Sequence, residues 1–171
     1  LVGFFGINEK PTSSKDPLAL RRSAIGLLRV VIENNLSIKL RYLINYAIRL
    51  YEEQGVQIQN TNAEKEVLEF LKERMRNILR IKNIKNDIIE ASVSSHIGDN
   101  FLDLYRKNIV MSKYINKPVG KDVINSYKRA SNIIENINDR ITGSPDAVLF
   151  RQDEEKALFE KINEIRKDFT V

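Results

Sequence analysis

Apolar residues recur at spacings of three and four residues along nearly the whole chain, and no segment shows the alternation of a half-buried strand. That periodicity places apolar side chains on one face of successive α-helices. Only 7 Gly and 4 Pro interrupt a chain of 171 residues, so few positions break these helices. The sequence therefore predicts an all-α fold, a helical bundle of about seven helices.

Residues that favour helix starts separate the periodic segments. The expected starts are Asp16 as N-cap with Pro17 at the first helical position, Ser37, Thr61 with Glu64 at capping-box spacing, and Asp153. Three further helices are expected over roughly residues 84–96, 99–116 and 121–138. The pattern of the helix after residue 121 places Val123, Tyr127, Ala130, Ile134 and Ile137 on one side.

Composition excludes several kinds of site. The chain has no cysteine, so disulfides, thiolate metal sites and cysteine nucleophiles are excluded, which fits a reducing compartment. The single histidine, His96, lacks the partners of a zinc site or a hydrolytic triad. No apolar run approaches the length of a membrane span, and the first residues do not resemble a signal peptide. Because the chain opens on apolar residues without Met, we expect a piece of a longer polypeptide.

The net charge is +5, and the basic excess lies in the first two thirds of the chain. In the first helix, Arg22, Gly26, Arg29 and Glu33 follow one another at spacings of four, three and four, so they share one face. Two arginines beside a glycine suit a phosphate backbone, because the guanidinium fork matches phosphate oxygens. The alternative is that Gly26 lets another helix pack closely while the arginines pair with carboxylates.

Two further helices carry polar stripes. Lys72, Arg76 and Arg80 repeat at every fourth position, with Glu69 and Glu73 placed to pair with the first two. Either a solvated helix face or phosphate contact explains this stripe. In the helix after residue 121, one face carries Asn125, Arg129, Asn132 and Asn136, with Lys128 beside it. Amide and guanidinium groups bind base edges and phosphates, although exposed polar faces are common.

Several segments resemble one family in order along the chain. The segment PTSSKDPLALRRSAIGLLRVVIENN, which begins at Pro11, is similar to a segment of the β subunits of bacterial-type glycyl-tRNA synthetases. Ser13 and Leu18 depart from the glycine and phenylalanine usual there. The segments EKEVLEFLKERMRNILR, YKRASNII and AVLFRQDEEKALFEKI resemble later segments of that family. An ordered series of matches over nearly the whole chain is harder to obtain by chance than any one motif.

The resemblance implies a tRNA-binding part of a glycine–tRNA ligase, in which the α subunit uses ATP and Mg²⁺ for the chemistry. It implies tRNA(Gly) and the α subunit as partners in a heterotetramer in the cytoplasm, with no membrane or DNA role. It also implies the end of an HD-like helical domain over residues 1–97 and the first part of a helical anticodon-binding domain over 98–171. No catalytic residue, cofactor or metal site is expected in this chain. The RNA-binding candidates are Arg22, Arg29, Lys72, Arg76, Arg80, Lys128, Arg129 and Asn132.

Two alternatives stay open at this point. The chain could be a helical anticodon-binding domain of another aminoacyl-tRNA synthetase, or a helical scaffold that binds only protein. The segment KDPLALRR argues against the first. A scaffold without an RNA role predicts no salt-dependent affinity for tRNA.

Overall fold

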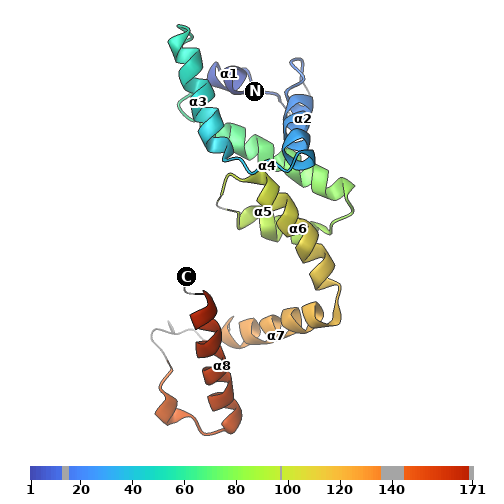
Figure 1. Cartoon of the computed structure of the whole chain (residues 1–171), viewed down its shortest axis with the longest axis vertical. Coiled ribbons are helices and arrows are strands. Elements are labelled where there is room, and N and C mark those ends of the chain that lie inside the picture. The colour runs from blue at the N-terminus through green and yellow to red at the C-terminus, as the bar shows by residue number, and fades with distance from the viewer. Residues whose placement is uncertain (13–15, 97, 136–144, 170–171) are drawn as a thin grey trace. The chain divides into compact units, whose positions relative to one another are not determined.

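The computed structural model describes residues 1–12, 16–96, 98–135 and 145–169, and within these it is all-α, as predicted (Figure 1). These residues contain eight α-helices and one 3₁₀ turn, joined by loops, which is one helix more than the periodicity indicated. The helices are α1 (Val2–Gly6), α2 (Leu20–Glu33), α3 (Leu40–Glu53), α4 (Ala63–Ile81), α5 (Asn86–Ser94), α6 (Phe101–Ile115), α7 (Pro118–Glu135) and α8 (Asp153–Phe169), and the turn η1 spans Ala147–Leu149.

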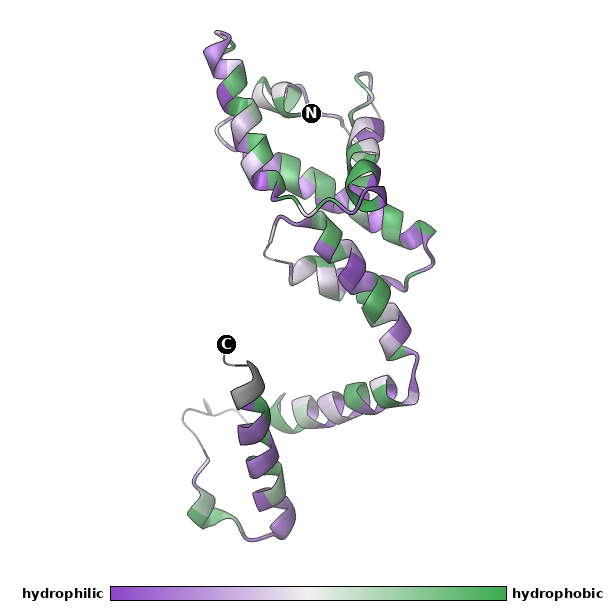
Figure 2. Ribbon diagram, in the orientation of Figure 1, coloured by the Kyte–Doolittle hydropathy of each residue, from purple (hydrophilic) through white to green (hydrophobic). Residues whose placement is uncertain are grey.

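Helix α4 is the centre of the first part of the molecule. Helices α1, α2, α3, α5 and α6 all pack against it, as Figure 1 shows. Val67, Leu68, Leu71, Met75 and Leu79 of its apolar face are buried, and Figure 2 shows that hydrophobic residues recur along α4 and the helices around it. The most deeply buried core residues, at 0% exposure, are Ala24, Leu28, Met75, Leu79, Ile89, Phe101 and Leu104. Burial of this face accounts for the three-and-four spacing read from the sequence.

Helix α1 was not predicted, because five residues are too few to show a helical period. It is held by tertiary contacts instead. The Phe5 ring is buried against Phe70, with ring centroids 5.3 Å apart. The amide groups of Gln59 and Asn60 both donate to the Gly6 carbonyl at 2.9 Å, and the Asn60 side chain donates to the Phe5 carbonyl at 3.0 Å.

The predicted cap of α2 is wrong in detail. Pro17 lies in a turn rather than in the first helical position, and Ala19 has a left-handed backbone with φ 53°. The Asp16 carboxylate still accepts from the first turn, from the amide of Leu20 at 2.8 Å and that of Arg21 at 3.1 Å. The side chain that was expected to start the helix therefore caps it from four residues upstream.

The other predicted caps are also corrected. Ser37 does not cap α3, because the Arg41 amide donates to the Asp99 carboxylate at 3.0 Å. No side-chain cap forms at the start of α4, and Glu64 binds Arg41 and Asn45 instead of closing a capping box. Asp153 is itself the first residue of α8. At α3 an acceptor distant in sequence replaces the local one that spacing suggested, whereas at α8 the nearby Glu155 carboxylate accepts from the amides of Arg151 and Gln152.

By packing, the chain divides into two compact units, residues 1–127 and 128–171. This division falls within α7, and α5 and α6 share the core of the first unit. It describes contacts in this chain, so the family-based domains, 1–97 and 98–171, stay a prediction. Among the described helices, none is long and apolar enough to cross a membrane.

Candidate nucleic-acid interface

Helix α2 presents Arg22, Gly26 and Arg29 to solvent, as the spacing predicted. A methyl group added at Gly26 would meet nothing within 4 Å, so no described element packs closely there. Neither arginine makes an ion pair or hydrogen bond with any residue that the structure describes. As far as the described residues go, the packing alternative for Gly26 is therefore wrong, and both guanidinium groups are open to an external anion.

Arg29 also borders a shallow cavity of about 280 Å³ between α2, α4 and α6. Lys82, just after α4, lines the same cavity, so two cations from distant parts of the sequence converge on it. The Glu33 carboxylate lies in the lining as well and offsets part of their charge. The arrangement extends the α2 stripe into a concave surface suited to a group with several anionic oxygens.

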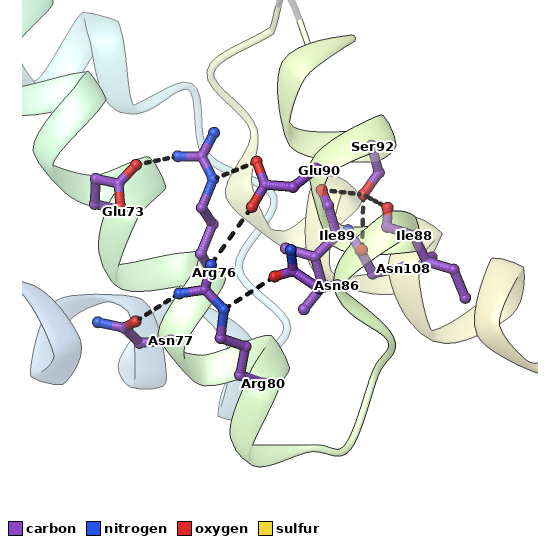
Figure 3. Close-up of polar contacts among 10 residues, drawn as sticks. All are labelled: Glu73, Arg76, Asn77, Arg80, Asn86, Ile88, Ile89, Glu90, Ser92 and Asn108. Atoms are coloured by element: carbon purple, nitrogen blue, oxygen red, sulfur yellow. Dashed lines mark hydrogen bonds and ion pairs between the residues drawn. The ribbon is translucent and has the colours of Figure 1, made fainter.

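The stripe on α4 has a different environment, drawn in Figure 3. Arg76 donates to Glu73 on its own helix and, through Nε, to Glu90 of α5 at 3.1 Å. Arg80 approaches the other oxygen of Glu90 at 3.5 Å and donates to Asn77 and Asn86 at 3.2 Å each. The two guanidinium groups therefore share Glu90, and together they fasten α5 to α4.

Lys72 completes this stripe and pairs with Glu69 at 2.9 Å, with only 20% of its side chain exposed. The predicted pairs Glu69–Lys72 and Glu73–Arg76 are thus confirmed. Spacing could not show the role of Glu90, because it lies on another helix. RNA contact by Lys72, Arg76 and Arg80 stays a prediction, now for groups whose charge is largely compensated inside the chain.

On α7, Lys128 and Arg129 are exposed, and neither pairs with a residue in the described ranges. Asn132 is exposed too, and it is not without a partner. Asn136 and Ile137, which the sequence placed on this helix, lie outside the described residues. Several apolar residues of α7 are exposed, among them Val123 at 53% and Tyr127 at 72%.

His96 is the only histidine, and partial burial lowers its pKa, with the nearby positive charges of Lys72 and Lys107 adding to the effect. Its Nε2 is buried and has no hydrogen-bond partner among the described residues. Among those residues, no group of three His, Asp or Glu side chains could hold a metal ion. His96 is thus a partly buried imidazole just after α5, in edge contact with Phe101.

A third exposed surface was not among the predicted sites. Tyr42 and Tyr46 stack on the solvent side of α3, and the Arg49 guanidinium lies over the Tyr46 ring. The sequence contained the signal, since these residues are spaced by four and three on the face opposite Leu40 and Ile44.

The fold and these surfaces define an all-α protein with cationic helix faces suited to a polyanion. A family model described as "Glycyl-tRNA synthetase beta subunit" matches residues 1–94, more than half of the chain. The chain belongs to this family, which sets aside the alternative of a domain from another synthetase.

Curated relatives agree with the family model. The glycine–tRNA ligase beta subunit of Rickettsia africae is 38% identical over 165 residues, which is 96% of this chain and 23% of that protein. The corresponding protein of Rickettsia typhi is 39% identical over 162 residues, and that of Rickettsia prowazekii is 35% identical over 171. The chain thus spans about a quarter of the length of these relatives, 23% to 24%.

Proposed function

We propose that this chain is a tRNA-binding part of the β subunit of a glycine–tRNA ligase, and that it contributes tRNA(Gly) binding to the ATP-dependent attachment of glycine. Family membership supports the parent activity. The observation that carries the binding role is the open pair Arg22 and Arg29, continued by Lys82 at the cavity beside α2. These cations have the exposure and freedom that contact with a phosphate backbone requires.

The roles proposed for the rest of the enzyme rest on family membership alone. An α subunit would use ATP and Mg²⁺ to activate glycine, and the two kinds of subunit would form a heterotetramer in the cytoplasm. This chain would then hold the tRNA and contribute no catalytic residue. A second contact would come from Lys128, Arg129 and Asn132 on α7, with Lys72, Arg76 and Arg80 contributing less because of their internal partners.

Filter binding of tRNA(Gly) to the full chain tests the α2 contact. The double substitution Arg22→Ala and Arg29→Ala should weaken binding. It should also make the negative slope of log K against log salt shallower by about 1 to 2, because each lost phosphate contact reduces the magnitude of that slope by about 1. Lys156→Ala with Lys161→Ala removes two positive charges from exposed positions on α8 and serves as the matched control. An unchanged salt slope in the α2 variant would contradict the proposal that Arg22 and Arg29 contact phosphates.

The same assay on Lys128→Ala with Arg129→Ala tests the contact on α7. A flatter salt slope would support phosphate contact there, and unaltered affinity would favour a purely structural role for this face.

A second candidate function is a scaffold for other proteins. The exposed apolar residues of α7, Val123, Tyr127, Ile133 and Ile134, favour it, because contiguous exposed apolar groups commonly mark interaction surfaces. This candidate predicts no salt-dependent affinity for tRNA, so the binding experiment separates the two.

A further inference from the structure

The solvent face of α3 carries aromatic rings where charged groups are usual. Tyr42 and Tyr46 are 69% and 43% exposed, and they lie opposite the buried residues Leu40 and Ile44 of the same helix. They therefore contribute little to the core. Aromatic pairs spaced by four stabilise a helix only slightly, so local helix stability does not account for two large rings facing water.

The geometry of this face is ordered. The two tyrosine rings are stacked, with centroids 6.5 Å apart and planes 11° from parallel. The central carbon of the Arg49 guanidinium lies 5.2 Å from the Tyr46 ring centroid. Three planar π groups thus follow one another along about two turns of one helix, and stacking restricts their motion before any ligand binds.

This face suits nucleobases better than an apolar protein segment. Bases stack on tyrosine rings and guanidinium planes regardless of sequence, while the arginine also attracts phosphate. Arg49 is available for this, because its ion pair with Glu53 is 3.6 Å long and both side chains are more than 60% exposed, at 64% and 61%. An exposed pair of that kind is weak and easily exchanged.

We propose that Tyr42, Tyr46 and Arg49 form a platform on which unpaired RNA nucleotides stack, a contact that supplements phosphate binding by α2. This inference rests on the proposed RNA-binding role and adds to it the chemical group that α3 would recognise, the flat face of a base. The hydroxyl groups are not needed for that contact, whereas the rings are.

Tyrosine fluorescence gives a direct readout, because the chain has no tryptophan to mask it. The full chain is titrated with an oligomer of eight uridines and, separately, with an abasic ribose-phosphate oligomer of the same length and charge. Stacked bases should quench the emission, and the uridine oligomer should bind more tightly than the abasic one. Tyr42→Leu with Tyr46→Leu should abolish the quenching. It should weaken binding of the uridine oligomer at least about tenfold, roughly the loss of one stacked base, and leave the affinity for the abasic oligomer unchanged.

Three further variants sharpen the test. Tyr42→Phe with Tyr46→Phe should restore the preference for bases, because the ring faces remain. Tyr114 lies on α6 and is 44% exposed, so Tyr114→Leu serves as a control and should leave that preference intact. Circular dichroism of each variant checks that the helices persist, and Arg49→Gln weakens the platform without removing a ring.

The outcomes separate this inference from the proposed function. Salt-dependent binding of tRNA with equal affinity for the two oligomers in every variant overturns the platform and leaves the tRNA role standing. Absence of any RNA binding by the unaltered chain overturns both. A base preference that depends on Tyr42 and Tyr46 and returns with phenylalanine establishes the platform.

Discussion

Two cationic stripes on neighbouring helices look alike in the sequence and differ in the structure. Arg22 and Arg29 of α2 have no ion pair with any residue in the described ranges, while Arg76 and Arg80 of α4 converge on Glu90 of α5. The difference lies in what packs beside each helix. A charge stripe that faces a carboxylate on a neighbouring helix becomes part of the fold, whereas one that faces solvent stays available to a ligand.

The most direct way to break this comparison is to remove a cation from the compensated stripe. Arg76→Met should lower the free energy of unfolding by about 1 to 2 kcal/mol, because it leaves Glu90 without its shorter ion pair and removes a side chain that is only 15% exposed. Arg22→Met, the matched change on α2, should stay within about 0.5 kcal/mol. Urea denaturation followed by circular dichroism measures both, and equal losses would contradict the distinction.

The extent to which sequence predicted this contrast depends on the distance between partners. Glu69–Lys72 and Glu73–Arg76 were predicted because residues three apart meet on a helix. Glu90 was not, because its approach to Arg76 depends on how the chain turns between α4 and α5. The same holds for Asp99, which caps α3 from 58 residues beyond Arg41. Periodicity located the helices and their local ion pairs, but tertiary contacts supplied the Asp99 cap of α3 and the Glu90 partner of Arg76 and Arg80.

Gly26 offers a second test, on the open stripe. Gly26→Ala should raise the free energy of unfolding by about 0.5 to 1 kcal/mol, because a mid-helix glycine is unfavourable and the added methyl meets nothing within 4 Å. Thermal unfolding of the full chain measures the gain. If alanine instead weakened association with the proposed α-subunit partner, that partner's backbone would pack at this glycine, and α2 would be a protein interface.

The charge compensation of the α4 stripe can also be removed. Glu90→Gln keeps the shape and an acceptor oxygen but removes the negative charge that Arg76 and Arg80 share. We expect a loss of less than about 1 kcal/mol in the free energy of unfolding, because the Glu90 side chain is 41% exposed. If charge compensation by Glu90 is what keeps Arg76 and Arg80 from binding RNA, the affinity for tRNA should rise about twofold to tenfold, with a steeper dependence on salt. Unchanged affinity would place this stripe away from RNA.

The smallest expected effect is a change in the pKa of His96, which reports the positive charge that remains near α4. Burial is the main cause of its lowered pKa, and Lys72 contributes even though it pairs with Glu69. Because the folded state binds the proton less well than the unfolded state, whose pKa is near 6.5, stability should fall as the pH drops through 6.5 toward the folded pKa. The only imidazole in the chain can be titrated by NMR without assignment, and Lys72→Gln should raise its pKa. If Lys72→Gln left the titration unchanged, Glu69 would neutralise Lys72 fully, and the α4 stripe would offer a polyanion even less than its ion pairs suggest.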